Sequence, residues 1–395
     1  MQYVIKLKVY EAFAGKGTFS SAMKEIGVPI EIVGYCEIDK YASTAFSAIH
    51  NIDEDMNDWD ISKINTKQLP DFDVFTHGSP CTSYSSAGKR DGGDKGSGTE
   101  SSLMWYSVDI IEHKKPKYIL WENVSAVLQN KHKHNFDQYI SDLNDIGYNS
   151  YWKVINALDS GIPQTRERIY VVSIRKDIDD GTFMFPEYNY RETMKSLKSE
   201  LESDAEPPIY HNIYGGFGET KPRVFENYSP TIRTAKGGGH IPSVKLKTIL
   251  EDNVDPKYQL SQNYLNYISE KESKNYNFRV AINSPEEVLK TPLRAKGDKA
   301  VVNDGTKRFL TPLECWRLMD ESDENFYKVK AALIEKFYHG KDRSNSQLYK
   351  IAGNSIVKRV LKIYMEQLFK NYINLQNNKF QKPIDKSKNC DIISM

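Results

Sequence analysis

The chain has 395 residues, of which 39% are apolar and 27% are charged. Lys and Arg together number 54 and Asp and Glu number 53, so the formal net charge of +1 gives no global sign of a polyanionic partner. At about 100–200 residues per domain, this length predicts two or three domains with a substantial core.

No apolar run approaches the roughly 18 residues that a membrane-spanning helix needs, so we do not expect an integral membrane protein. The N-terminus also lacks the apolar block of a secretory signal. The cysteines Cys36, Cys81, Cys315 and Cys390 show no C-x-x-C spacing, so neither a disulfide scaffold nor a metal site is expected. The expected compartment is a reducing cytoplasm.

From the N-terminus to Arg175, strand-like segments alternate with helical ones. The expected strands are Tyr3–Phe13, Ile30–Asp39, Asp73–Gly78 and Lys117–Val124, and the expected helices include Ser20–Ile26 and Ser101–Pro116. This alternation predicts an α/β fold with a Rossmann-like, doubly wound, mostly parallel sheet. Two further strands, Ser150–Ala157 and Arg168–Arg175, are too close for a helix between them and predict an antiparallel hairpin.

The composition changes after about Phe185, where prolines and glycines separate short strand-like pieces. We interpret this part as a smaller, irregular second domain. Helical patterning returns at Leu310–Asp320 and at Asn354–Phe369, which carries one apolar face. We therefore assign residues 1–183, completed by 345–378, to the first domain, 184–344 to the second, and 379–395 to a frayed tail.

A glycine loop follows the first expected strand and opens a helix, with Gly15 and Gly17 in a G-x-G arrangement. Glu37 ends the second strand, where a carboxylate can accept hydrogen bonds from ribose hydroxyls. A dinucleotide fingerprint would have glycine where Ser20 lies, which favours another adenosine cofactor over NAD. A tight turn followed by a solvated glutamate fits the same pattern.

Cys81 lies in a loop just past the strand that ends at Gly78. Most single cysteines are small core residues, which suits Cys36 and Cys315 in their apolar segments. The neighbours of Cys81 are Gly, Ser, Pro and Thr, which make a poor core, and a glycine-rich stretch up to Gly98 follows. This context favours a nucleophilic thiolate beneath a loop that closes over a substrate.

Glu122 ends the strand Lys117–Val124, and parallel strands present their carboxyl ends at one edge of the sheet. Its carboxylate is therefore expected near Cys81, although an acid at a helix N-terminus would give the same pattern. Gln164, Arg166 and Arg168 lie at the hairpin turn, with the two arginines on one face. Charges on an exposed hairpin edge are the plainer interpretation of that pair.

Six blocks of this sequence occur in the order of known motifs. They are 13–17, 78–88, 122–124, 164–168, 308–319 and 349–361. Through these blocks the chain resembles the cytosine-5 DNA methyltransferases. The family uses S-adenosylmethionine, and its target-recognition domain corresponds to the region between 175 and 308. The resemblance thus implies that the first domain is catalytic and that the second binds DNA.

The resemblance also implies a cofactor pocket, with the first glycine loop near the methionine and ribose, a carboxylate on the ribose and an apolar contact at the adenine. The implied cofactor-binding residues are Phe13, Gly15, Gly17, Glu37, Ile38, Asp60, Ile61, Pro80, Asn354 and Ser355. No metal is implied.

Cys81 matches the family's nucleophile, Glu122 its acid facing the base, and Arg168, supported by Arg166, its contact to the base carbonyl. The implied activity is methyl transfer from S-adenosylmethionine to C5 of a flipped-out cytosine in a specific duplex DNA sequence, through a covalent Cys81–C6 adduct. S-adenosylhomocysteine is the product. Thr82 departs from the family's usual Gln, which leaves the DNA contacts of this loop open.

Basic side chains gather between residues 207 and 250, which carry a local charge of +4. The segment Ser229–His240 combines them with glycines, which suits approach to a phosphate backbone, and a solvated loop fits equally well. The residues expected to contact nucleic acid are Ser85, Gln164, Arg233, Lys236 and Gly238. With so little net charge elsewhere, we expect modest non-specific affinity for DNA.

Two rival functions stay open beside DNA methylation. One is a tRNA cytosine-5 methyltransferase on the same scaffold, which the long insert between Arg175 and Arg308 disfavours. The other is a catalytically silent DNA-binding relative, which the intact Cys81, Glu122 and Arg168 disfavour. We expect a monomer in the cytoplasm of a prokaryotic or phage-infected cell, with duplex DNA as substrate and a restriction endonuclease acting separately as one alternative partner.

Overall fold

The computed structural model describes residues 6–81, 84, 92–162, 164–187 and 311–374, together with the backbone of five short strands between 206 and 309. Five residues singled out from the sequence lie outside the described residues. They are Thr82, Ser85, Arg233, Lys236 and Gly238. The predicted tail at 379–395 lies outside them as well.

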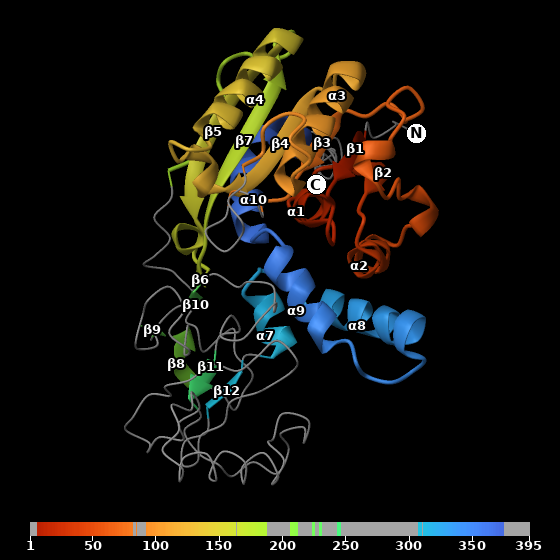
Figure 1. Cartoon of the computed structure of the whole chain (residues 1–395), viewed down its shortest axis with the longest axis vertical. Coiled ribbons are helices and arrows are strands. Elements are labelled where there is room, and N and C mark those ends of the chain that lie inside the picture. Colours follow the sequence, from red (N-terminus) through yellow and green to blue (C-terminus); the bar gives the residue numbers. More distant parts are fainter. Residues whose placement is uncertain are drawn as a thin grey trace, which may run out of the picture.

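A six-stranded mixed sheet forms the centre of the first lobe, in the order β2-β1-β3-β4-β7-β5 (Figure 1). Its strands are β1 (Leu7–Ala12), β2 (Ile30–Cys36), β3 (Val74–His77), β4 (Tyr118–Val124), β5 (Tyr148–Asn156) and β7 (Glu167–Arg175). The first four are parallel, whereas β7 is antiparallel to both β4 and β5. The predicted mostly parallel sheet and its antiparallel hairpin are therefore confirmed.

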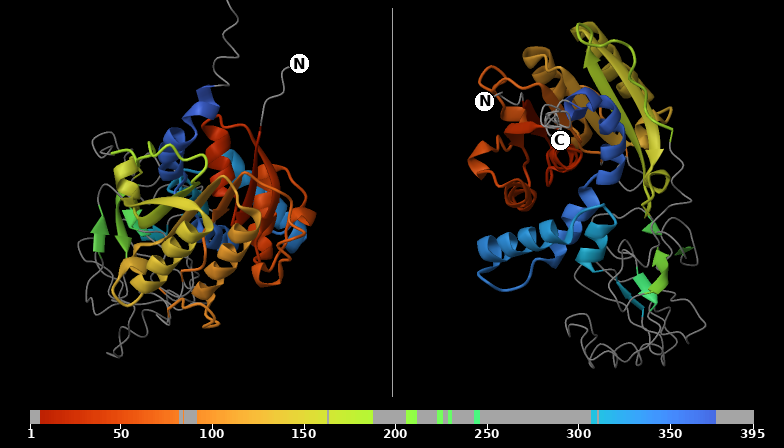
Figure 2. Two further views of the ribbon diagram at one scale, coloured as in Figure 1. Left: turned by 90° about the horizontal axis from the view of Figure 1, so that it is seen from above. Right: turned by 180° about the vertical axis from the view of Figure 1, so that it is seen from behind.

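Helices cover both faces of this sheet, as the view from above in Figure 2 shows. They are α1 (Thr18–Glu25), α2 (Lys40–His50), α3 (Met104–Lys114), α4 (Lys133–Ile146) and α10 (Lys358–Leu368). Alternation along β1 produces the two layers: Leu7 and Val9 enter the core with α1 and α10, while Tyr10 and Ala12 enter the core with α3 and α4. A strand buried on both faces is typical of a doubly wound fold.

Three helices after residue 310 extend this core. They are α7 (Pro312–Arg317), α8 (Asp323–Tyr338) and α9 (Asn345–Asn354). A capping box begins α7: the side chains of Thr311 and Glu314 each accept a hydrogen bond from the other residue's backbone N–H. Trp316 of this helix is buried in the core shared with α1 and α10. The rings of Tyr41 on α2 and Phe337 on α8 are 4.6 Å apart. The boundary predicted at 344 lies between α8 and α9, and the division of the chain into domains stays a prediction.

Short strands make up the described part of the second lobe, below the first in Figure 1. They are β8 (Glu206–His211), β9 (Arg223–Phe225), β11 (Ser243–Lys245) and β12 (Lys307–Phe309), in an antiparallel sheet of order β12-β11-β8-β9. Between the lobes, β10 (Ser229–Pro230) pairs in parallel with β6 (Gln164–Thr165). The basic segment predicted to contact DNA thus begins beside the hairpin turn of the first lobe.

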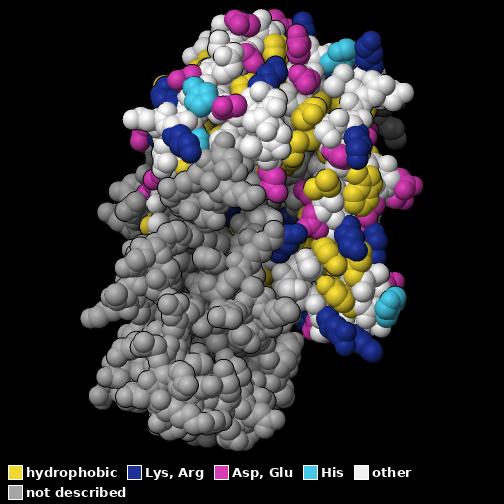
Figure 3. Space-filling model, in the orientation of Figure 1, with side chains coloured by type: hydrophobic (Ala, Val, Ile, Leu, Met, Phe, Trp, Pro, Cys, Tyr) yellow, Lys and Arg dark blue, Asp and Glu magenta, His cyan; other side chains and the backbone are white. Residues whose placement is uncertain are grey.

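Acidic and basic side chains are intermixed on the described face shown in Figure 3, which accords with the small net charge. Within the described ranges, no helix combines the length and apolar character that crossing a membrane requires. The same ranges contain no group of three or more His, Cys, Asp or Glu side chains placed to hold a metal ion.

Candidate active site

Three predicted catalytic side chains come from adjacent strands of the sheet. Cys81 follows β3, and Glu122 lies near the end of β4, whose carboxyl end is at the same edge because the two strands are parallel. Arg168 lies at the start of β7, which runs antiparallel to β4, so that Val124 pairs with Arg168. Sheet topology therefore brings the three side chains to one edge.

Glu122 and Arg168 form an ion pair at this edge, with Arg168 Nε 3.2 Å from Glu122 Oε1. Both side chains are largely buried. Burial raises the pKa of Glu122, although Arg168 and Arg166 act in the opposite direction. Burial likewise raises the pKa of the half-buried Cys81 thiol, against the pull of Arg168, while the charge of Glu122 adds to the rise.

The turn that carries Cys81 is fixed by side chains of β4. Asn123 Nδ2 donates to Ser79 O and Ser79 Oγ, at 3.1 and 3.2 Å, and Trp121 Nε1 donates to the same hydroxyl at 3.1 Å. All three residues are buried. Sequence reasoning singled out Glu122 in this strand but missed Asn123 and Trp121 as the groups that hold the segment before Pro80 and Cys81.

Arg166 lies deeper than Arg168 and is 4% exposed. Its Nη2 donates to Ser355 O at 2.6 Å and to Gly353 O at 3.3 Å, so it ties the hairpin to the end of α9. Gln164 is fully buried and donates to Leu318 O at 2.7 Å. The prediction that Gln164 contacts nucleic acid does not fit this position, because its side chain faces the protein interior.

The glycine loop and Glu37 meet directly. Glu37 Oε2 accepts a hydrogen bond from Gly15 N at 2.8 Å, and Oε1 accepts one from Asp39 N at 2.8 Å. Burial raises the pKa of Glu37, while these two N–H groups act to lower it. Each carboxylate oxygen retains a second lone pair, so Glu37 can still accept ribose hydroxyls.

The loop also depends on left-handed backbone at Phe13, Gly15 and Gly17. At Gly17 (φ 77°) a Cβ atom would lie 2.1 Å from His50 Nε2, so only glycine fits there. His50 Nε2 is 3.0 Å from Gly17 O, and burial lowers the pKa of His50 to about 3, which keeps the ring neutral.

Asn57, which sequence reasoning missed, joins the two turns beside this loop. Its Oδ1 accepts from Glu37 N and Trp59 N, each at 2.9 Å, and its Nδ2 donates to Glu37 O at 2.9 Å. Ile38 and Trp59 are exposed next to these bonds, at 73% and 41%. They leave apolar surface available for an adenine ring.

The remaining predicted cofactor residues occupy different environments. Asp60 caps the 3₁₀ turn Ile61–Lys63, and its bonds to Lys63 and Ser62 lower its pKa to about 2. The Ile61 side chain is buried in the core with α3, so contact with a ligand there would come from backbone. Ser355 Oγ lies 2.9 Å from Thr18 Oγ1, which places the end of α9 beside the glycine loop, and the neighbouring Asn354 is exposed.

A family model described as C-5 cytosine-specific DNA methylase matches residues 7–370. The chain belongs to this family. It is a DNA (cytosine-5-)-methyltransferase, and enzymes of this family generally use S-adenosylmethionine. The resemblance inferred from the six sequence blocks is thereby confirmed.

Relatives of this methyltransferase come from phages and bacteria. The orphan methyltransferase M.SPRI of Bacillus phage SPR is 31% identical, with 94% of this chain and 99% of the relative covered. The type II methyltransferase M2.ScrFI of Lactococcus lactis subsp. cremoris is 30% identical over 92% of this chain and 99% of its own. The type II methyltransferase M.HhaI of Haemophilus parahaemolyticus is 29% identical, with coverages of 90% and 92%.

Solved structures support the same fold. The S. pombe Dnmt2 methyltransferase superposes with a TM-score of 0.57 at 16% identity, covering 93% of this chain and 99% of its own. A putative DNA modification methyltransferase encoded within an E. coli prophage gives a TM-score of 0.53 at 17% identity, with coverages of 93% and 100%.

Proposed function

We propose that this methyltransferase transfers a methyl group from S-adenosylmethionine to C5 of a flipped-out cytosine in a specific duplex DNA sequence, through a covalent Cys81–C6 adduct. The convergence of Cys81, Glu122 and Arg168 at one edge of the sheet supports this proposal most directly. A nucleophile, an acid and a fixed cation in one place are what addition to a pyrimidine ring requires.

In the proposed reaction, the Cys81 thiol gives its proton to water, and the thiolate sulfur bonds to C6 of the cytosine as the C5–C6 double bond opens. Negative charge then develops on N3 and O2 of the ring. Burial raises the pKa of Glu122, which favours its taking up a proton and sharing it with N3, and the Arg168 guanidinium stabilises the charge at O2. C5 thereby becomes nucleophilic. After methylation, a water molecule takes the C5 proton, the C5–C6 double bond re-forms, and the Cys81–C6 bond breaks to free the thiolate.

S-adenosylmethionine, when bound, supplies the electrophilic methyl group. The residues around the glycine loop fit this cofactor: Gly15 and Gly17 leave the backbone open, and Glu37 is held at 2.8 Å from Gly15 N with lone pairs to spare. Ile38 is exposed beside them for contact with the adenine. We keep Pro80 and Asn354 in the proposed pocket because the family resemblance implies them.

The target cytosine must leave the helix, because C5 and C6 cannot be reached inside a stacked duplex. Base flipping costs a few kcal/mol, which contacts in the pocket offset. We infer that the second lobe contacts the duplex, since β10 pairs with β6 and so joins the basic segment to the hairpin that carries Arg168. In this proposal the protein is a monomer, and a cognate restriction endonuclease, where one exists, acts separately.

The first test is methylation-sensitive sequencing of DNA from cells that express the protein. One recurring sequence context with methylated cytosine is expected. A duplex that carries 5-fluorocytosine at that position should then form a complex that survives denaturation with the wild type but not with Cys81→Ala. Methyl transfer to tRNA alone, or no covalent complex with the wild type, would overturn the proposal.

A further inference from the structure

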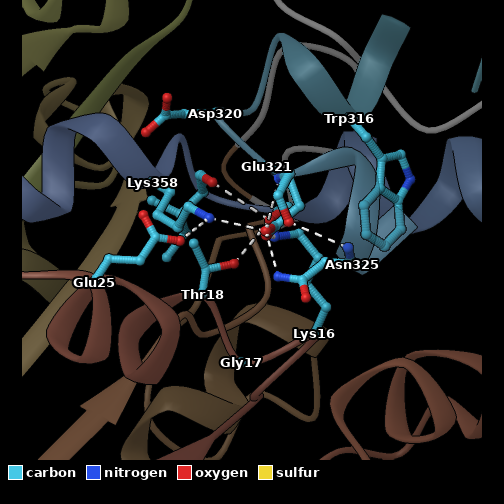
Figure 4. Close-up of polar contacts among 12 residues, drawn as sticks. Lys16, Gly17, Thr18, Glu25, Trp316, Asp320, Glu321, Asn325 and Lys358 are labelled. Carbon is cyan, nitrogen blue, oxygen red and sulfur yellow. Dashed lines mark hydrogen bonds and ion pairs between the residues drawn. The ribbon is translucent and has the colours of Figure 1, made fainter. Parts of the chain in front are cut away.

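A cluster of buried charges lies directly behind the cofactor loop (Figure 4). Lys16, between the two loop glycines, is 2% exposed; Glu321, after α7, is 4% exposed; and Lys358, at the start of α10, is 1% exposed. Long charged side chains are seldom so fully buried unless they are paired. The three come from distant parts of the sequence, and Lys16 and Glu321 are 305 positions apart.

Glu321 is the centre of this cluster. Its Oε2 forms an ion pair with Lys16 Nζ, and its Oε1 lies 2.8 Å from Lys358 Nζ. Oε1 also accepts hydrogen bonds from Asn325 Nδ2 at 2.8 Å and from Ser322 N at 3.1 Å. Burial acts to raise the pKa of Glu321, but the two lysines outweigh it and hold that pKa well below its usual range. The carboxylate is therefore a fixed anion.

The two lysines are not equivalent. Lys358 also pairs with Glu25, near the end of α1, and Glu25 is bridged in turn by Lys362 at 3.0 Å. Lys358 would thus keep a carboxylate partner without Glu321. Among the described residues, Glu321 is the carboxylate paired with Lys16, whose ammonium otherwise lies 5.5 Å from the Trp316 ring.

Among the contacts that hold the cofactor loop, three link Gly15, Lys16 and Gly17 to side chains elsewhere in the protein. Gly15 N donates to Glu37, and Gly17 O is bonded by His50, both within the first half of the first lobe. The third contact is the ion pair between the Lys16 side chain and Glu321, which follows the strands of the second lobe along the chain. Because Lys16 is shielded from water, the carboxylate determines where its ammonium lies and hence how the backbone between the glycines is held.

We propose that Glu321 is a positioning residue for the cofactor loop, setting the affinity for S-adenosylmethionine through Lys16 rather than acting on the reacting atoms. This inference rests on the proposed function, because it takes the glycine loop as the cofactor site. Buried ion pairs add little to stability on average, so the presence of this cluster behind the loop favours a role in fixing one geometry.

The test compares Glu321→Gln with the wild type by calorimetric titration with S-adenosylhomocysteine and by steady-state methylation of duplex DNA. Loss of the charge should weaken binding and raise the KM for S-adenosylmethionine at least about tenfold, as expected for a charge-assisted hydrogen bond. The kcat and the KM for DNA should change much less. The conservative Glu321→Asp should recover most of the affinity.

Asp320→Asn is the matched control, because Asp320 is adjacent and pairs with Lys362 at 2.7 Å without touching Lys16. Its affinity for S-adenosylhomocysteine should equal that of the wild type. Should Glu321→Gln fail to fold, Lys16→Met answers the same question, since it leaves Glu321 paired with Lys358 and removes only the link to the loop.

The inference is overturned if Glu321→Gln and Lys16→Met bind S-adenosylhomocysteine like the wild type while only their thermal stability falls, which would make the cluster purely structural. It is also overturned if Asp320→Asn weakens binding as much. A wild type that binds no S-adenosylhomocysteine would instead contradict the proposed function itself.

Discussion

Two buried glutamates in this methyltransferase have opposite surroundings. Glu122, at the sheet edge, forms an ion pair with Arg168, and burial raises its pKa. Glu321, between α7 and α8, accepts hydrogen bonds from an amide and a backbone N–H and pairs with two lysines, which lower its pKa. In the proposed mechanism, the same type of side chain takes part in proton transfer where burial raises its pKa, and it is a fixed anion where two lysines lower its pKa.

The largest effect is expected at the thiol beside Glu122. Cys81→Ala removes the nucleophile, so methyl transfer should fall by about 10⁴-fold or more. Binding of S-adenosylhomocysteine should stay at the wild-type level, since Cys81 does not hold the cofactor loop. Tritium transfer to duplex DNA measures the first quantity and calorimetry the second. Residual activity within tenfold of the wild type would rule out the covalent route.

Glu122→Gln should affect kcat, whereas Glu321→Gln should affect the KM for S-adenosylmethionine. The amide keeps the shape but cannot share a proton with N3, so kcat should fall by about 10²–10⁴-fold. The KM for S-adenosylmethionine should hardly change, in contrast to the expected result for Glu321→Gln. Steady-state kinetics with both substrates checks this. A raised KM for the cofactor with an unchanged kcat would reverse the assignment of roles.

Stability should separate the same two variants. Glu321→Gln leaves two buried lysines without their shared anion, so the free energy of unfolding should drop by about 3–5 kcal/mol. Glu122→Gln removes a carboxylate that is costly to bury, so stability should be unchanged or higher by up to about 1 kcal/mol. Urea unfolding of the three proteins, followed by far-UV circular dichroism, provides the comparison. Equal losses in both variants would remove the distinction.

The smallest effect is expected in the pH dependence of stability. The folded pKa of Glu321 lies below its ordinary 4.5, so its contribution is present above pH 4.5 and is lost as the pH falls through the folded pKa. The folded pKa of Glu122 is raised, so its contribution is present below 4.5 and is lost as the pH rises. Urea midpoints measured between about pH 2 and 8 should show that Glu321→Gln removes the loss of stability below pH 4.5, and that Glu122→Gln removes only the loss of stability above pH 4.5.

Much of the fold could be predicted because it follows from local sequence patterns. The alternation of strands and helices predicted the sheet. Gly15 and Glu37 were singled out separately from the sequence, and the structure adds a direct contact of 2.8 Å between them, which was not predicted from the sequence. The interpretation of Cys36 and Cys315 as core residues is confirmed, since they are 2% and 1% exposed.

Other features depend on partners that no local pattern reveals. Gln164 is polar and close to a turn, yet its side chain points inward to Leu318 O, a bond that spans 154 positions. In the sequence, Lys16 cannot be distinguished from an exposed loop lysine, because its partner Glu321 is far away along the chain. Asn57 and Asn123 act through bonds to backbone atoms of other segments, and amide side chains in loops and strand ends are too common to mark that role.

The order in which the core is assembled has a consequence for synthesis. Thr18 and Ser355 touch at 2.9 Å but are 337 positions apart, and α10 lies in the same core as α1. At about 5–20 residues per second, the ribosome needs roughly 15–70 s to make the chain between them. A nascent chain therefore leaves the apolar face of α1 without its α10 partner during that time. Synthesis must reach α10 before the proposed cofactor pocket can be completed.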